Sequence, residues 1–137
     1  KGRSVTMNEM GSIEDLIHYR LEKSEQAYQD AKLLAERESW NAVVNRLYYA
    51  CLYATMALLV KNQLSHGTHA GVRHQLNLHF IKKGIIKPSM GKFYNKLSQR
   101  REIGDYKDFV EFEAREVISL QSEAREFIDI VKDLISS

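Results

Sequence analysis

The chain has 137 residues, of which 44% are hydrophobic, and this is enough for one domain with a core that needs no disulfide or metal. A single proline and seven glycines leave few helix breaks, so the composition predicts an all-α protein. The one cysteine excludes an intramolecular disulfide and, with no signal peptide in view, predicts a cytoplasmic location.

The formal net charge of +2 hides an uneven distribution. Residues 39–101 carry ten Lys or Arg and four of the five His, but no Asp or Glu. Residues 1–38 hold six basic and eight acidic residues, and residues 102–137 hold four and ten. This pattern predicts either an electropositive face for an anionic partner such as RNA, or acidic terminal helices that neutralise a basic middle.

The first elements are a leader and a long helix. Residues 1–11 are predicted to be a disordered leader, and residues 12–137 a single helical domain. Ser12 and Asp15 resemble a capping box. Apolar residues then recur at helical spacing, which predicts a helix over about 13–37.

A second helix is predicted over about 40–62, with Ser39 as its N-cap. Its apolar residues cover nearly every face, so it should be central, with Tyr48, Leu52 and Met56 largely buried. Cys51 should be a small core residue within it. The longest apolar run, 47–60, is shorter than the roughly 20 residues of a membrane span, so no membrane association is expected.

Three further helices complete the predicted fold. Thr68 should cap a third helix that ends at Gly84, and Ser89 should begin a fourth that Gly104 interrupts. An apolar stripe from about Val110 to Ile135 predicts a long closing helix. The expected architecture is an antiparallel bundle of about five helices.

Arg46 is the first candidate functional residue because it lies on the most apolar predicted helix. A buried charge is costly without a partner, and the surrounding basic segment has no carboxylate. Arg46 should therefore pair with an acid of a terminal helix, of residues 102–108 or of another chain, or point into a polar seam or a subunit interface.

A second candidate is the segment Arg100-Arg101-Glu102-Ile103-Gly104-Asp105-Tyr106, at the turn into the closing helix. The planar fork of an arginine suits phosphate or carboxylate recognition. The alternative is a helix-end motif in which Arg101 bonds Asp105 or the last carbonyls and Tyr106 seals the core.

Lys92, Lys96 and Arg100 share one face of the fourth predicted helix. Like charges at this spacing cost roughly 0.2–0.5 kcal/mol per pair, so an anionic partner or nearby acids should offset them. The closing helix supplies three candidate acids, Glu111, Glu113 and Glu116.

The four histidines of the basic segment do not predict a metal site. Successive spacings of three, five and five residues place no two neighbours at the i,i+4 spacing of a helical ligand pair, and no cysteine lies near (His66, His69, His74, His79). No cofactor is expected, because no glycine-rich phosphate loop or paired catalytic carboxylates appear either.

Four short motifs, in order, resemble the HEPN domains (higher eukaryotes and prokaryotes nucleotide-binding). They are Asn45-Arg46-Leu47-Tyr48-Tyr49-Ala50, Thr68-His69-Ala70-Gly71-Val72, His79-Phe80-Ile81-Lys82-Lys83-Gly84 and Arg101-Glu102-Ile103-Gly104-Asp105-Tyr106. The resemblance covers about residues 13–135. It implies a helical bundle that commonly forms homodimers and is often encoded beside a minimal nucleotidyltransferase, as in toxin–antitoxin modules.

The resemblance also implies a chemistry. Many HEPN domains are metal-independent ribonucleases that use an arginine and a histidine a few residues apart. Arg101 matches that arginine, but Asp105 stands near the place of the histidine. An imidazole with a pKa of about 6.5 suits proton transfer near neutrality, and a carboxylate in its place cannot be assumed to do the same, so RNA or nucleotide binding carries over better than cleavage.

The main hypothesis is therefore a dimeric HEPN protein that works with a nucleotidyltransferase and binds RNA or nucleotide. A metal-independent ribonuclease and a purely structural adaptor are the alternatives, and the catalytic candidates are Arg101 and Asp105. The candidate binding residues are Asn45, Arg46, Tyr49, Lys92, Lys96, Arg100, Arg101 and Tyr106.

Overall fold

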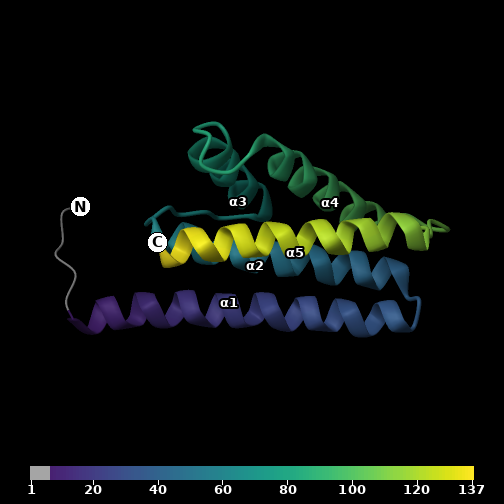
Figure 1. Ribbon diagram of the computed structural model, residues 1–137, viewed down its shortest axis with the longest axis horizontal. Coiled ribbons are helices and arrows are strands. Elements are labelled where there is room, and N and C mark those ends of the chain that lie inside the picture. The colour runs from purple at the N-terminus through teal and green to yellow at the C-terminus, as the bar shows by residue number, and fades with distance from the viewer. Residues whose placement is uncertain (1–6) are drawn as a thin grey trace.

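The computed structural model describes residues 7–137, and the helices in this range form the predicted all-α bundle (Figure 1). No strand occurs among these residues. A π-helical segment, η1, follows α3 directly. The elements are α1 (Met7–Glu36), α2 (Trp40–Lys61), α3 (His69–Leu76), η1 (Asn77–Ile81), α4 (Pro88–Tyr106) and α5 (Ala114–Ser136).

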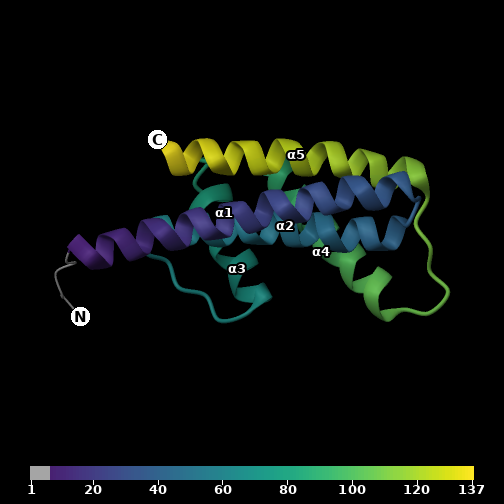
Figure 2. The ribbon, with the colours of Figure 1, turned by 90° about the horizontal axis from the view of Figure 1, so that it is seen from below.

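Three long helices, α1, α2 and α5, lie side by side, and α3 and α4 complete the bundle (Figure 1). The short turn after α1 makes α2 run antiparallel to it. In the second view α5 lies on one side of the α1 and α2 pair and α3 on the other, while α4 crosses behind the pair from the α5 side to the far side (Figure 2). Helix α4 therefore contacts both α2 and α5.

Helix α2 is the centre of the core, as its apolar pattern predicts. Tyr48 and Leu52 are 1% and 2% exposed, whereas Met56 is only partly buried. Over its whole length α2 is long and apolar enough to cross a bilayer. We did not expect this from the sequence, because the longest apolar run, 47–60, is shorter than a membrane span. Since 67% of its most apolar window is buried inside the bundle, it has the character of a core helix.

Cys51 is fully buried on α2, in agreement with its predicted role in the core. Burial raises the pKa of its thiol far above the ordinary value, because desolvation disfavours the thiolate. The side chain therefore acts as a small apolar group.

The first helix begins earlier than predicted. Part of the expected leader, residues 1–6, lies outside the described residues, but α1 already begins at Met7 and continues through Gly11 and Ser12. The capping-box interpretation of Ser12 is therefore wrong. Met and Glu are good helix formers, and one glycine in a helix costs only about 1 kcal/mol, so the helix can extend past it.

Two predicted caps have different outcomes. Thr68 caps α3, since its hydroxyl accepts a hydrogen bond from the Gly71 amide at 2.9 Å. Ser39 is the N-cap residue of α2, as predicted, and its carbonyl accepts from the Val43 amide at 3.0 Å, but its side chain makes no capping hydrogen bond. Helix α4 begins at Pro88, whose fixed φ and missing amide hydrogen suit a first helical turn.

Gly104 does not interrupt the fourth helix, contrary to the prediction. Helix α4 continues to Tyr106, and a Cβ atom on Gly104 would lie 2.8 Å from the ring of Phe112. The glycine therefore makes room for a neighbouring ring.

Helix α5 begins at Ala114, later than the predicted Val110. The side chain of Asn41 holds the preceding segment out of the helix: its Nδ2 donates to the Val110 carbonyl at 2.7 Å, and its Oδ1 accepts from the Phe112 amide at 3.1 Å. Phe109 has a φ of 63°, which also ends helical geometry.

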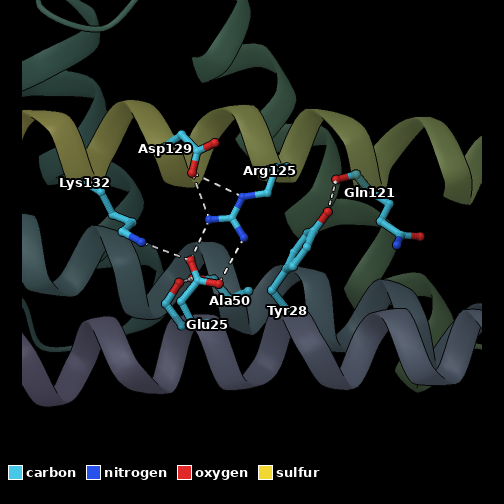
Figure 3. Close-up of polar contacts among 8 residues, drawn as sticks. Glu25, Tyr28, Ala50, Gln121, Arg125, Asp129 and Lys132 are labelled. Atoms are coloured by element: carbon cyan, nitrogen blue, oxygen red, sulfur yellow. Dashed lines mark hydrogen bonds and ion pairs between the residues drawn. The ribbon is translucent and has the colours of Figure 1, made fainter.

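Arg125 joins α5 to α1 through a cluster of polar contacts (Figure 3). Its two terminal nitrogens donate to the two carboxylate oxygens of Glu25 at 3.0 and 2.6 Å. Asp129 accepts from the same guanidinium at 2.9 Å, and Lys132 donates to Glu25 at 3.3 Å. The hydrogen bonds from Arg125 hold the pKa of Glu25 below its ordinary value, although burial opposes this.

We expect Arg125→Ala to lower the free energy of unfolding by about 1–2 kcal/mol at neutral pH, since its charge-assisted hydrogen bonds to Glu25 and Asp129 are lost at a site about one third exposed. The lowered pKa of Glu25 means that this contribution is present above the ordinary carboxyl pKa and is lost as pH falls through the lowered one. Urea denaturation at several pH values measures it.

The control for this experiment is Asp133→Asn, because Asp133 is exposed on α5 and makes no ion pair in the described part of the chain. Its stability should stay within about 0.5 kcal/mol of the parent. An Arg125→Ala protein as stable as the control at neutral pH would contradict the role of the cluster.

Candidate functional site

The structure places the Arg101 side chain against two tyrosines of α2. Arg101 lies near the end of α4 and is only 7% exposed. Its guanidinium carbon is 4.5 Å from the ring centroid of Tyr48 and 5.9 Å from that of Tyr49. This is a cation–π arrangement, in which the ring faces compensate part of the buried charge.

A chain of polar contacts links Arg101 to Arg46. Nη1 of Arg101 is 3.7 Å from Oδ2 of Asp105, one turn later on α4. The same oxygen accepts a hydrogen bond from Nδ2 of Asn45 at 3.0 Å, and Oδ1 of Asn45 accepts one from Nε of Arg46 at 3.1 Å. Helices α2 and α4 thus bring two arginines, an amide and a carboxylate into one network.

The Arg101 guanidinium is incompletely satisfied. Its Nε is buried and has no hydrogen-bond partner, and 3.7 Å is too long for a hydrogen bond to Asp105. Burial disfavours its charge, but Tyr48, Tyr49 and Asp105 together raise the pKa of Arg101 above its ordinary value. The site therefore holds a permanent positive charge with donor capacity left over.

Arg46 lacks the carboxylate that the sequence led us to expect. Within the range that the structure describes, no acid lies within 4 Å of its guanidinium, which instead stands 5.2 Å from the Tyr49 ring. Of the predicted alternatives, the polar seam is the one the structure supports. A counter-ion within the chain is not required because Arg46 is only half-buried, so solvent and a ring face can replace it, and an acid of another chain stays a prediction.

His69 is a site residue that sequence reasoning missed. It is the first residue of α3, and its ring centroid is 5.8 Å from that of Tyr48 and 5.7 Å from that of Tyr49. Desolvation and the charge of Arg101 lower the pKa of His69. The Thr68 cap signalled the helix start, but only the packing of α3 on α2 brings His69 to the arginine.

The other basic candidates on α4 are partly neutralised by α5. Arg100 donates to Glu116 at 2.6 Å, and Lys96 lies 3.8 Å from Glu123. Glu116 is therefore a partner as predicted, whereas Glu111 and Glu113 make no such ion pair with any described residue. Lys92 is exposed and has no carboxylate within 4 Å in the described chain. Internal neutralisation thus explains Lys96 and Arg100.

Tyr106 does not seal the core, contrary to the helix-end alternative. Its side chain is 77% exposed at the end of α4. The preceding residue, Asp105, faces Asn45 and Arg101, and the side chain one position later points elsewhere because successive helical residues differ by about 100°. Tyr106 is therefore available at the surface next to the polar network.

The described residues contain no cluster of three or more His, Cys, Asp or Glu that could hold a metal ion. The site can therefore be described by its arginines, tyrosines, amide, carboxylate and imidazole. Together these groups can bind an anion through Arg101 and Arg46 and stack against a planar ring through Tyr49.

Comparison with known proteins gives the relatives of this chain. A UPF0332 protein of Thermotoga maritima is 38% identical over 126 residues, covering 92% of this chain and 96% of that protein. A protein of Methanocaldococcus jannaschii named "Putative toxin MJ0605" is 32% identical over 120 residues, covering 88% and 89% of the two chains. The HEPN domain model matches residues 17–134, and the chain therefore belongs to the HEPN domain family.

Proposed function

We propose that this protein is a HEPN protein that binds RNA or a nucleotide as part of a toxin–antitoxin-like module, with a minimal nucleotidyltransferase as its partner and the cytoplasm as its location. The name of the Methanocaldococcus jannaschii relative supports the toxin-like context. The proposed partner is what the resemblance to HEPN domains encoded beside a nucleotidyltransferase implies. The site around Arg101 supports RNA or a nucleotide as the ligand.

One observation carries the proposed binding. Arg101 is almost fully buried, yet its charge is balanced mainly by ring faces and by a carboxylate at 3.7 Å. The neighbouring Arg100 is instead neutralised by a direct ion pair, in which its Nε lies 2.6 Å from a carboxylate oxygen of Glu116. A phosphate oxygen is the acceptor that a planar, doubly donating guanidinium fits best, so a phosphate at this site would complete the hydrogen bonding of Arg101.

Salt dependence tests this proposal. Binding of a short fluorescent single-stranded RNA should weaken as salt rises from about 50 to about 200 mM, because each phosphate contact releases counterions and contributes a log–log slope of about −0.7. Fluorescence polarisation measures the affinity. Affinity that stays constant over this range would contradict phosphate recognition.

We also propose that the protein is a homodimer with an isologous interface. Exposed apolar side chains, among them Leu33 at 61% and Ile118 at 56%, leave surface that a second copy can cover. Light scattering should give twice the monomer mass of 15.9 kDa at high protein concentration. A mass of one chain under these conditions and at low salt would contradict the dimer.

A further inference from the structure

A row of aromatic rings leads away from Arg101 along the α1 and α2 pair. The ring of Tyr53 is 6.1 Å from that of Tyr49. The ammonium of Lys23 on α1 stands 5.7 Å from the Tyr53 ring and 6.0 Å from the Tyr19 ring. Because α1 and α2 are antiparallel, Tyr19 continues the row in the direction set by Tyr49 and Tyr53. We call the surface formed by Arg46, Tyr49, Tyr53, Lys23 and Tyr19 the aromatic row.

The cations of the aromatic row combine two features. Lys23 and Arg46 contact rings, and neither has a carboxylate within 4 Å in the described part of the chain. Cations on α5 or beside it are instead paired with acids (Lys87, Lys96, Arg100, Arg125, Lys132). The row therefore keeps its positive charge next to its rings.

Helical geometry separates Lys23 from the residues that face α5. Lys23 and Glu25 are two residues apart on α1, so their side chains differ by about 200° around the helix. Glu25 faces Arg125 of α5, and Lys23 consequently faces away from α5. At the Tyr19 end of the row, Glu22 lies 3.2 Å from His18 and lines a cavity of about 240 Å³ with Tyr19, Lys23 and Gln26. At the other end, Arg46 lines a second cavity that also includes Asp30 and Glu36.

Two orphaned arginine donors accompany the row. Nε of Arg101 and Nη1 of Arg20 are buried without a hydrogen-bond partner, and the one other such side-chain atom among the described residues is the Tyr94 hydroxyl. Arg20 is on α1, one residue after Tyr19, and it is close enough to His66 to help lower the pKa of that histidine, mainly lowered by burial. Both ends of the row thus carry donors that the protein itself does not satisfy.

We propose that the aromatic row binds single-stranded RNA of several nucleotides, with bases stacked on Tyr49, Tyr53 and Tyr19 and phosphates held by Arg101, Arg46 and Lys23. This inference rests on the proposed function, to which it adds the ligand class and its path. About 10 Å of helix separates Arg46 from Tyr53, and Tyr19 lies further on, so the row is longer than one nucleotide.

The alternation of rings and cations favours this ligand over an acidic protein. Planar bases stack on exposed rings, and the phosphates between them need cations at intervals, which is how proteins bind single strands without reading sequence. An acidic peptide would use the cations but would gain little from Tyr19, which is 54% exposed.

The first test is a length series of oligouridylates, measured by competition against a fluorescent single-stranded RNA. Affinity should rise from a mononucleotide to an oligomer of about four residues and then level off. Replacing an internal uridine by an abasic residue keeps the phosphate and should cost about fivefold or more. Equal binding of mononucleotide and oligomer would overturn the proposal.

The second test compares matched variants. Tyr19→Ala and Lys23→Ala should each weaken oligomer binding about fivefold or more, and Lys23→Ala should also reduce the salt slope by about 0.7. Tyr19→Phe keeps the ring and should bind like the parent. Lys32→Ala removes the same charge from the opposite face of α1, about 180° from Lys23, and should change neither affinity nor slope.

The two proposals fail in different ways. If Tyr19→Ala and Lys23→Ala bind the oligomer like the parent while an Arg101 variant does not, the aromatic row is not a binding path. If the parent binds no RNA at low salt, or binds it independently of Arg101, the proposed function itself is wrong. Duplex RNA that binds as tightly as the single strand would overturn the stacking role of the row.

Discussion

Replacement of Arg101 by methionine should weaken the binding of single-stranded RNA by about ten- to a hundredfold, because hydrogen bonds to a charged group are worth roughly 1.5–3 kcal/mol each. Methionine keeps an unbranched apolar stem against the ring of Tyr48 and removes a buried charge, so the fold should survive. Fluorescence polarisation measures the affinity, and thermal melting checks the fold.

The matched control is Arg100→Met, one residue earlier on the same helix. Arg100 is the same residue type, but its guanidinium is already bound by Glu116 at 2.6 Å. RNA affinity should therefore change by less than about threefold, the shift expected from one partly neutralised surface charge. Equal losses in the two variants would mean that total charge, rather than the Arg101 pocket, governs binding.

Cleavage of RNA by the metal-free protein should be absent, or about 10²- to 10⁴-fold slower than in a HEPN ribonuclease that has the histidine, since this is the usual cost of a missing general acid or base. We expect that Asp105 does not replace that histidine. Its Oδ2 already accepts from Asn45 and lies 3.7 Å from Arg101, so the carboxylate acts as a positioning group for the arginine.

The measurement is a cleavage assay with pure protein in the presence of a chelator, with the Arg101→Met protein as the blank. Activity abolished by Asp105→Asn would show that the carboxylate does replace the histidine. Activity abolished by His69→Gln would point instead to the imidazole beside Tyr48 and Tyr49, and would favour the ribonuclease alternative. Either result would contradict the expected lack of cleavage.

Local patterns in the sequence were sufficient for the helix content and for the central place of α2. Apolar residues on every face of a helix favour removal of the whole helix from water, and in this chain Tyr48 and Leu52 are buried in the core of the bundle. Helix ends were less predictable, because they depend on neighbours. Gly104 reads as a break in sequence, but in the bundle it accommodates Phe112.

The sequence by itself determined the all-α fold, the membership in a family of helical bundles and the choice of Arg101 as a candidate site residue, because periodicity and motif order are local properties of a chain. Only the tertiary structure decided which charges remain available. Arg100 and Arg101 are adjacent in sequence, yet one meets Glu116 of α5 and the other meets the rings of α2. Counter-ions and ring faces come from helices distant in sequence, and only packing brings them together.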